Sequence, residues 1–288
     1  LKAGSYLIAA GASMSQIADQ LTTSGRNTCG TQVIFRVRVK SNDVVVKKLD
    51  LATNRYVEVT RWNFKEEFIS DLYTNALKHK DSQIRIVVSE GTTSWQIVNA
   101  LKEFEVLDGP VLDIPTEGTL APDSYEIKFG DLRTEVLERM KKVQAKRLEV
   151  VWLNRNEKTP VNNKHDLLIL ASIIEKETAI ASERPQVASV FANRLNQGKR
   201  LETDPTVIYG ITLGKGPLGR KLLRKDTQRD TPWNTYTNHG LPPSAIANPG
   251  LASLKAAVNP ATTKYIFFVA DGSGGHAFST TLKEHNRN

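Results

Sequence analysis

The sequence lacks most of the features that mark disulfide-rich, membrane-spanning or metal-dependent proteins. It holds one cysteine, Cys29, in 288 residues, so an internal disulfide framework is excluded. Its longest largely apolar run, residues 167–174, is too short to cross a bilayer. It begins at Leu1 rather than Met and shows no signal peptide. We therefore expect a fragment or a processed product, in which a lost N-terminal anchor would not be visible.

Motifs for metals, nucleotides and hydrolytic nucleophiles are also missing from the sequence. The five histidines show no His-Glu-x-x-His or other metal-ligand spacing. Gly214-Lys215-Gly216 lies outside the P-loop frame, and the Gly-rich run at 271–275 suits a hairpin turn better than a phosphate site. No Gly-x-Ser-x-Gly elbow is present. The sequence thus predicts no metal and no cofactor.

Positive charge exceeds negative charge by eight, because 39 Lys and Arg residues stand against 31 Asp and Glu residues. These cations are scattered, and no RNP motif, zinc-finger spacing or leucine zipper accompanies them. A nucleic-acid partner is therefore not expected. Two interpretations of the charge stay open: an ordinary solvated basic surface, or attraction to an anionic polymer or membrane face.

A weak internal repeat occupies the first third of the chain. Gly, Gln, Ile and Leu recur at the same spacing in residues 11–21 and 91–101, each time after a strand-like apolar run. Both copies read as a strand, a Gly turn, a Ser/Thr cap and a short helix, which we expect to pack as one module. Chance similarity is the competing explanation. Between the copies, β-branched runs at 33–60 predict an inserted strand meander, and apolar spacing at 62–78 predicts a helix.

Helix signals dominate the C-terminal half of the chain. Asp131 is positioned to cap one helix and Asp166 to cap the next. Pro185 suits the first turn of a third helix, and Gly198 suits its end. We therefore expect at least three helices in this half.

The chain should end in a short hairpin and one more turn of helix. Residues 265–269 read as a short buried strand, and residues 277–279 should pair back against it. Thr281 would open the final helix.

These patterns predict an α+β protein with two domains. Residues 1–107 would form a small α/β subdomain with a β-rich insertion at about 33–81. Residues 108–130 would form a loop-rich connector, and residues 131–288 a mainly helical domain with a short β-hairpin.

Glu175 and Glu177 stand out because they lie in an otherwise apolar helix. A carboxylate among Ile, Ala and Leu is costly unless it is paired or used. Glu175 shares its helical face with the small residues Ala171 and Ser172, whereas Glu177 lies over larger Ile side chains. Helical geometry alone does not say which carboxylate works. Both glutamates could equally be solvated, with the apolar residues packed behind them.

The segment Asn234–Gly250 is dense in Asn, Thr, Tyr, Gly and Pro. Hydroxyls, amides and ring faces presented together form the chemistry of a sugar-binding wall, although turns of this composition are common without any ligand. The candidate site therefore joins a helix carboxylate to a loop suited to saccharides.

Ordered motifs run through most of the chain. They are Glu117-Gly118, Pro122–Tyr125, Ala171–Glu177, Val190–Leu195, Thr203–Tyr209, Asn234–Tyr236, Gly240–Pro243, Ile246–Gly250 and Glu284–Asn286. With these motifs the chain resembles the endolytic murein transglycosylase family, whose members are called YceG-like or MltG. The repeat region resembles the family's LysM-like subdomain. The resemblance covers residues 1–26 and the chain from residue 84 to the C-terminus.

The resemblance implies a function and a location. Members of the family are anchored in the bacterial inner membrane by one N-terminal helix, and their catalytic part faces the periplasm or cell wall. They cut nascent peptidoglycan glycan strands internally, between N-acetylmuramic acid and N-acetylglucosamine, and leave 1,6-anhydro ends. The chain would thus be a lytic transglycosylase, with glycan strands as substrate and the cell-wall synthesis machinery as a partner.

The resemblance also names site residues. The family's catalytic acid is the first Glu of its Glu-Lys-Glu motif, which in this sequence is Glu175. Such an acid must keep its proton near neutral pH, and burial in an apolar helix favours that. Thr206, Asn234 and Tyr236 would bind and orient the sugar. A second carboxylate nucleophile is not required, because the muramic C6 hydroxyl attacks its own anomeric carbon.

Three positions depart from the family pattern. The segment at about 33–81 is longer than the resemblance leads us to expect. Glu202 stands where the family often has Gln, and Ser244 replaces a common Gly. Glu202 therefore puts the mode of sugar binding in question.

Two other functions stay open at this stage. A murein-binding scaffold without activity would also suit a LysM-like module and a basic surface. A hydrolytic muramidase would need a water-activating group beside Glu175, for which Glu177 and Asp204 are the local candidates.

Overall fold

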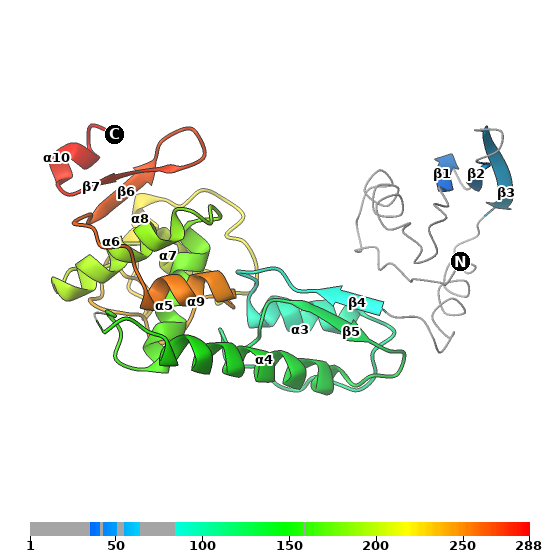
Figure 1. Ribbon diagram of the computed structural model, residues 1–288, viewed down its shortest axis with the longest axis horizontal. Helices are drawn as coiled ribbons and strands as arrows, with labels where there is room; N and C mark the ends of the chain where they lie inside the picture. The colour runs from blue at the N-terminus through cyan, green and yellow to red at the C-terminus, as the bar shows by residue number, and fades with distance from the viewer. Residues whose placement is uncertain (1–34, 41–42, 51–54, 64–83, 158) are drawn as a thin grey trace. The chain divides into compact units, whose positions relative to one another are not determined.

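The computed structural model describes residues 35–40, 43–50, 55–63, 84–157 and 159–288. The chain divides into two compact units, residues 1–86 with 124–131 and residues 87–123 with 132–288. Small sheets and separate helices place the protein in the α+β class, as predicted (Figure 1). Among the described residues, none of the helices is long and apolar enough to span a membrane. The domain boundaries at residues 107 and 130 stay predictions.

The predicted strand meander is present in the first unit. β1 (Phe35–Lys40), β2 (Asp43–Asp50) and β3 (Arg55–Asn63) form an antiparallel sheet in chain order. Trp62 and Asn63 were expected to begin a helix, and this is wrong, because β3 continues its pairing with β2 through both residues. The remainder of that expected helix and the first repeat copy lie outside the described residues.

The second repeat copy forms as predicted. The apolar run before it is β4 (Ile84–Val87), which pairs with β5 (Ser124–Ile127). Gly91 then turns the chain with φ 75°, a left-handed conformation that suits glycine. Thr93 caps α3 (Ser94–Glu103) in a capping box with Gln96. The LysM-like character of this region stays a prediction.

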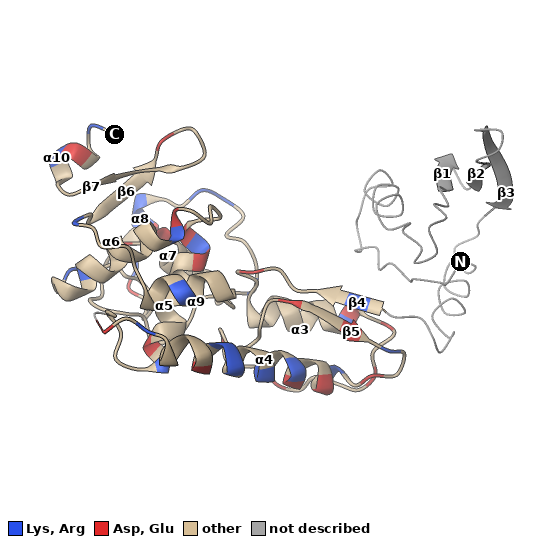
Figure 2. Cartoon of the chain, in the orientation of Figure 1, with Lys and Arg blue, Asp and Glu red and all other residues tan. Residues whose placement is uncertain are grey.

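The second unit contains the remaining helices. They are α4 (Arg133–Leu153), α5 (Lys164–Glu177), α6 (Arg184–Asn196), α7 (Asp204–Thr212), α8 (Arg224–Thr227) and α9 (Leu251–Val258). Pro185 lies in the first turn of α6, and Gly198 follows its end with φ 64°, so both predicted signals are confirmed. Along α4, Lys and Arg outnumber Asp and Glu (Figure 2).

Two predicted caps are wrong by short distances along the chain. The N-cap of α5 is Asn163, whose side chain accepts a hydrogen bond from the Asp166 N–H at 2.9 Å. The N-cap of α4 is Leu132, while the Asp131 carboxylate accepts from the Lys128 N–H instead. In both places several polar residues compete for one cap, and propensity alone does not rank them.

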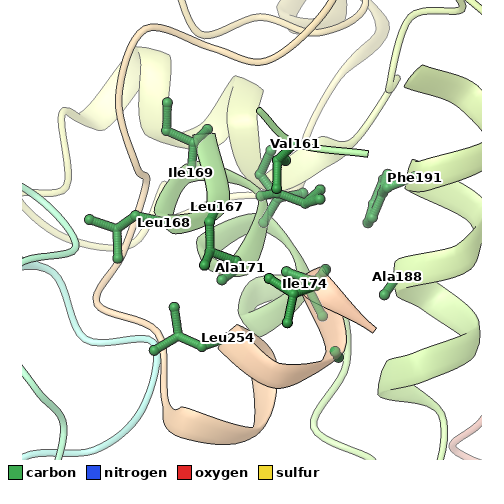
Figure 3. Close-up of a cluster of buried hydrophobic side chains, with 14 of the residues drawn as sticks. Val161, Leu167, Leu168, Ile169, Ala171, Ile174, Ala188, Phe191 and Leu254 are labelled. Atoms are coloured by element: carbon green, nitrogen blue, oxygen red, sulfur yellow. The ribbon is translucent and has the colours of Figure 1, made fainter. Parts of the chain in front are cut away.

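α5 is the central helix of the second unit. Its residues Leu167–Ile174 are all buried, and they pack against α9 and α6, with Leu254, Ala188 and Phe191 around them (Figure 3). Each fully buried Leu or Ile side chain contributes about 1.5–3 kcal/mol. This packing fixes the axis of α5, and therefore fixes the directions in which Glu175 and Glu177 leave its last turn.

The C-terminal hairpin consists of β6 (Phe267–Ala270) and β7 (His276–Ser279), followed by α10 (Leu282–His285). The pairing and the Thr281 cap are confirmed. The first strand begins two residues later than predicted and is half-buried rather than buried. The Asp271 carboxylate accepts from the Ser273 and Gly275 N–H groups, which holds the turn.

Candidate active site

Glu175 and Glu177 leave the last turn of α5 on different sides. Residues two apart on a helix are separated by about 200°, so they cannot share one environment. The surroundings of each glutamate therefore decide what it can do.

The Glu175 side chain is sheltered, with 5% of its surface exposed. Its Oε2 accepts a hydrogen bond from the Gly250 N–H at 2.9 Å, at the start of α9. The Arg184 guanidinium lies 3.5 Å from Glu175 Oε1 and 3.5 Å from Glu90 Oε2. A Cβ at Gly250 would overlap the Glu90 carboxylate, which would then have to move. Glu175 is thus held by an ion pair and a backbone donor.

Glu177 lines a pocket of about 380 Å³, which we call the Glu177 pocket. Its walls are Glu177, Val190, Phe191, Arg194, Leu201, Glu202, Asp204, Tyr236, Phe267, Phe268, Leu282 and His285. Burial raises the pKa of Glu177, a hydrogen bond from the Thr203 hydroxyl opposes the rise, and the Asp204 charge adds to it. The Glu177 carboxyl is therefore sheltered and disposed to keep its proton. Glu175 is not among the lining residues.

The polar side of the Glu177 pocket joins the turn before α7 to the Asn234–Tyr236 segment. The Tyr236 hydroxyl donates to Asp204 Oδ1 at 2.7 Å, and burial followed by this bond raises the pKa of Tyr236. Tyr236, predicted to bind sugar, therefore lies in the pocket wall near Glu177.

Thr206 and Asn234, the other predicted sugar ligands, are both 0% exposed. The Thr206 hydroxyl donates to the Thr203 carbonyl at 2.7 Å and contacts the Thr235 hydroxyl at 2.8 Å. The Asn234 amide donates to the Thr227 and Arg229 carbonyls, at 3.0 and 2.7 Å. A sugar cannot touch either side chain in this geometry. They hold the loops that carry Asp204 and Tyr236.

The two departures from the family pattern in this unit have definite contacts. Glu202 lies in the pocket wall with φ 53° and forms an ion pair with Arg194. Ser244 Oγ accepts a hydrogen bond from Trp233 Nε1 at 2.9 Å. A Gln at position 202 would leave the Arg194 charge without this carboxylate.

Two further carboxylates were missed by the reasoning from sequence. Burial raises the pKa of Glu117, which accepts hydrogen bonds from the Ser94 N–H at 2.7 Å and from the Tyr209 hydroxyl at 3.2 Å. Hydrogen bonds from His276 lower the pKa of Glu183 and join β7 to the start of α6. The Glu117-Gly118 motif was the available signal for the first. Glu183 had none, because its partner is distant in sequence.

A metal centre has no support in the described ranges, where no cluster of three or more His, Cys, Asp or Glu side chains could hold an ion.

The chain has relatives among known proteins. The profile of the YceG-like family matches residues 6–288. A Bacillus subtilis (strain 168) protein named endolytic murein transglycosylase is 39% identical over 173 residues, which are 60% of this chain and 47% of the relative. A protein of the same name from Streptococcus pneumoniae (strain ATCC BAA-255 / R6) is 30% identical over 178 residues, which are 60% of this chain and 31% of the relative. The chain therefore spans about half or less of these relatives' length.

A solved structure is also similar. The crystal structure of a yceG-like protein from Listeria monocytogenes has a TM-score of 0.58 and is 30% identical, covering 76% of this chain and 80% of that one.

Proposed function

Because the chain belongs to the YceG-like family, we propose that it is a lytic transglycosylase that acts on peptidoglycan. Relatives named endolytic murein transglycosylase support this activity. In full, the proposal is internal cleavage of nascent glycan strands between N-acetylmuramic acid and N-acetylglucosamine, with 1,6-anhydro ends as products. One observation carries it: Glu177, a carboxyl whose pKa is raised by burial, lies beside Tyr236 in the wall of a pocket.

The reaction needs one carboxyl group that serves twice. As an acid it protonates the bridging oxygen while the bond to the muramic anomeric carbon breaks. The muramic C6 hydroxyl then attacks that carbon, and the carboxylate takes the hydroxyl proton. No water is consumed and the carboxyl regains its proton. A positioned acid contributes about 10²–10⁴-fold in rate.

The geometry supports Glu177 as this acid. Its carboxyl lines a space that a ligand can enter, and burial favours its protonated form at neutral pH. The Thr203 hydroxyl fixes one carboxyl oxygen, which leaves the other for the substrate. Asp204 and Tyr236 lie in the same wall.

Glu175, the residue named by the family resemblance, stays the second candidate. Both of its oxygens have partners in the protein, Arg184 and the Gly250 N–H, and Glu175 does not line the Glu177 pocket. Its side chain is buried, but its contacts fit a role in fixing α9 and α6 against α5. Replacing each glutamate by Gln and comparing the two rates of cleavage decides between the residues.

Of the three residues predicted to bind sugar, Tyr236 keeps that role in the proposal. Tyr236 lines the pocket, and its hydroxyl donates a hydrogen bond to Asp204. Thr206 and Asn234 would support binding indirectly, through the loops that they order. The family resemblance further suggests work at the outer face of the bacterial inner membrane, beside the cell-wall synthesis machinery.

Product analysis tests the activity. Uncrosslinked glycan strands are incubated with the protein, and the new ends are identified by mass spectrometry. We expect internal fragments that carry 1,6-anhydromuramic ends. Reducing ends would instead identify a hydrolytic muramidase, in which Asp204 beside Glu177 activates water. Binding without any new ends would identify a non-catalytic scaffold.

A further inference from the structure

The Glu284-His285-Asn286 motif near the C-terminus is not used by the proposed reaction, yet its histidine lines the Glu177 pocket. The His285 ring stacks on the Phe267 ring, with centroids 5.2 Å apart and planes 23° apart. α10 and β6 therefore contribute stacked rings to the pocket lining, whereas Glu177, Glu202 and Asp204 contribute carboxyl groups.

Hydrogen bonds to Glu284 hold α10 in position. Its carboxylate accepts from the Thr280 N–H and hydroxyl at 3.0 Å each, and from the Thr281 N–H at 3.2 Å. The Thr281 hydroxyl accepts from the Glu284 N–H in return. The first residue of the motif thus orders the turn from which the second residue projects.

The lining of the pocket is rich in hydrogen-bond acceptors and poor in free side-chain donors. Glu177, Glu202 and Asp204 supply carboxyl oxygens. All three guanidinium nitrogens of Arg194 are engaged, by the Arg200 carbonyl, the Ile266 carbonyl and Glu202. The Tyr236 hydroxyl already donates to Asp204. Among the lining residues, the His285 ring and the second N–H groups on Nη1 and Nη2 of Arg194 are the side-chain donors left without a protein acceptor.

The two nitrogens of the His285 ring differ. Nδ1 is shielded from solvent and has no hydrogen-bond partner. Buried N–H groups without an acceptor are rarer in proteins than buried acceptors without a donor, so we assign the proton of the neutral ring to Nε2. Nε2–H is then the donor that a ligand in the pocket can meet.

A saccharide with an N-acetyl group complements this arrangement. Sugar hydroxyls can donate to the pocket's carboxyl oxygens, whereas the acetamido carbonyl accepts only and needs a donor. We propose that His285 is a specificity residue that donates from Nε2 to the acetamido carbonyl of the bound sugar. This inference rests on the proposed function in one respect, that the Glu177 pocket holds the saccharide.

Binding of short oligosaccharides tests the inference without cleavage. Chitotetraose carries acetamido groups and cellotetraose carries hydroxyls at the same positions, and neither contains muramic acid. Their affinities for the 288-residue chain are measured by calorimetry, together with those of His285→Ala, His285→Gln and the control Lys283→Ala, an exposed neighbour on α10 that does not line the pocket.

We expect the wild-type chain to prefer chitotetraose. His285→Ala should reduce that preference about 3- to 10-fold, the value of one hydrogen bond. His285→Gln, which keeps an N–H donor, should restore part of the preference, and Lys283→Ala should leave it unchanged. An unchanged preference in His285→Ala, or no binding of chitotetraose at all, overturns the inference. Failure of the proposed function is seen separately, as an absence of anhydro ends from wild-type digests.

Discussion

At the scale of single residues, the chemistry depends on which way two neighbouring side chains point. Glu175 meets a guanidinium and a backbone N–H, whereas Glu177 meets a pocket. The sequence pattern predicted a working carboxylate in this stretch without choosing between the two, and the family resemblance chose Glu175. The assignment proposed here rests on the contacts of Glu175 with Arg184, in α6, and Gly250, just before α9, which the local sequence pattern does not reveal.

Tertiary contacts also decide which polar residues of the predicted sugar-binding segment are available to a ligand. Thr206 and Asn234 have the right chemistry for sugars, and their composition suggested that role. In the folded protein Thr206 donates its hydrogen bond to the Thr203 carbonyl, and Asn234 donates to the Thr227 and Arg229 carbonyls. Composition identifies donors and acceptors, but only the tertiary structure shows which of them are already occupied.

The difference in unfolding free energy between Glu177→Gln and the wild type should change with pH. Because the pKa of Glu177 is raised in the folded state, its contribution to the free energy of unfolding is full below the unfolded-state pKa and is lost as pH rises through the folded-state pKa. Gln does not ionise and can keep the Thr203 hydrogen bond. The variant should therefore gain stability relative to the wild type between about pH 4 and about pH 8. Urea unfolding at both pH values measures this, and a difference that is constant with pH contradicts it.

At the scale of secondary-structure elements, short polar links position the site. The Asn248 side chain is fully buried and joins three segments of the second unit. Its Oδ1 accepts from the Leu120 N–H at 2.9 Å, and its Nδ2 donates to the Thr92 carbonyl at 2.9 Å and lies 3.2 Å from Glu117 Oε1. The loop before α9 is thereby fixed to the start of α3 and to the connector.

Asn248→Ala should destabilise the second unit by about 2–4 kcal/mol, because the buried Leu120 N–H and Glu117 lose partners together. Urea unfolding gives the value. Asn259→Ala is the control, since Asn259 is exposed and should change stability by less than about 0.5 kcal/mol. Equal effects from the two variants would show that the link is not structural.

Gly118 fixes the connector in a second way. It has φ 87°, and a Cβ there would lie 2.8 Å from Ala245 Cβ and 2.9 Å from Leu168 Cγ. Gly118→Ala should cost about 2–4 kcal/mol from strain and overlap together. Gly198→Ala isolates the strain, because its φ is 64° with no heavy atom within 4 Å, and should cost about 1 kcal/mol. Similar thermal stabilities of both variants would refute the overlap.

Element types were easier to predict than their ends. The apolar helix before Glu175, the Pro185 start, the Gly198 stop and the C-terminal hairpin all follow from local patterns. Cap positions at Asp131 and Asp166 failed by a few residues, because neighbouring polar side chains compete for one helix end. The pocket itself could not be predicted, since its walls come from α5, α6, the turn before α7, β6 and α10.

At the scale of the whole molecule, a net charge of +8 attracts anionic polymers to the protein. Peptidoglycan carries carboxylates on its peptide stems and is such an anionic polymer. Lys and Arg outnumber Asp and Glu on α4, and further Lys and Arg residues lie on other elements (Figure 2). The attraction should therefore be general and sensitive to salt.

Binding to isolated peptidoglycan should weaken roughly threefold or more when the ionic strength rises from about 0.05 to about 0.3 M. Cosedimentation of the protein with peptidoglycan measures this. Binding of neutral chitotetraose is the matched control and should change little over the same range. Peptidoglycan binding that is indifferent to salt would mean that the net charge has no part in recognition.

The identity of the acid is the central claim, and one comparison tests it most directly. Glu177→Gln and Glu175→Gln are assayed side by side for release of 1,6-anhydro ends from uncrosslinked glycan, after thermal unfolding has shown that both are folded. We predict that Glu177→Gln loses about 10²–10⁴-fold in rate, while Glu175→Gln stays within about tenfold of the wild type. The reverse order would return the role to Glu175 and contradict the claim that Glu177 is the acid.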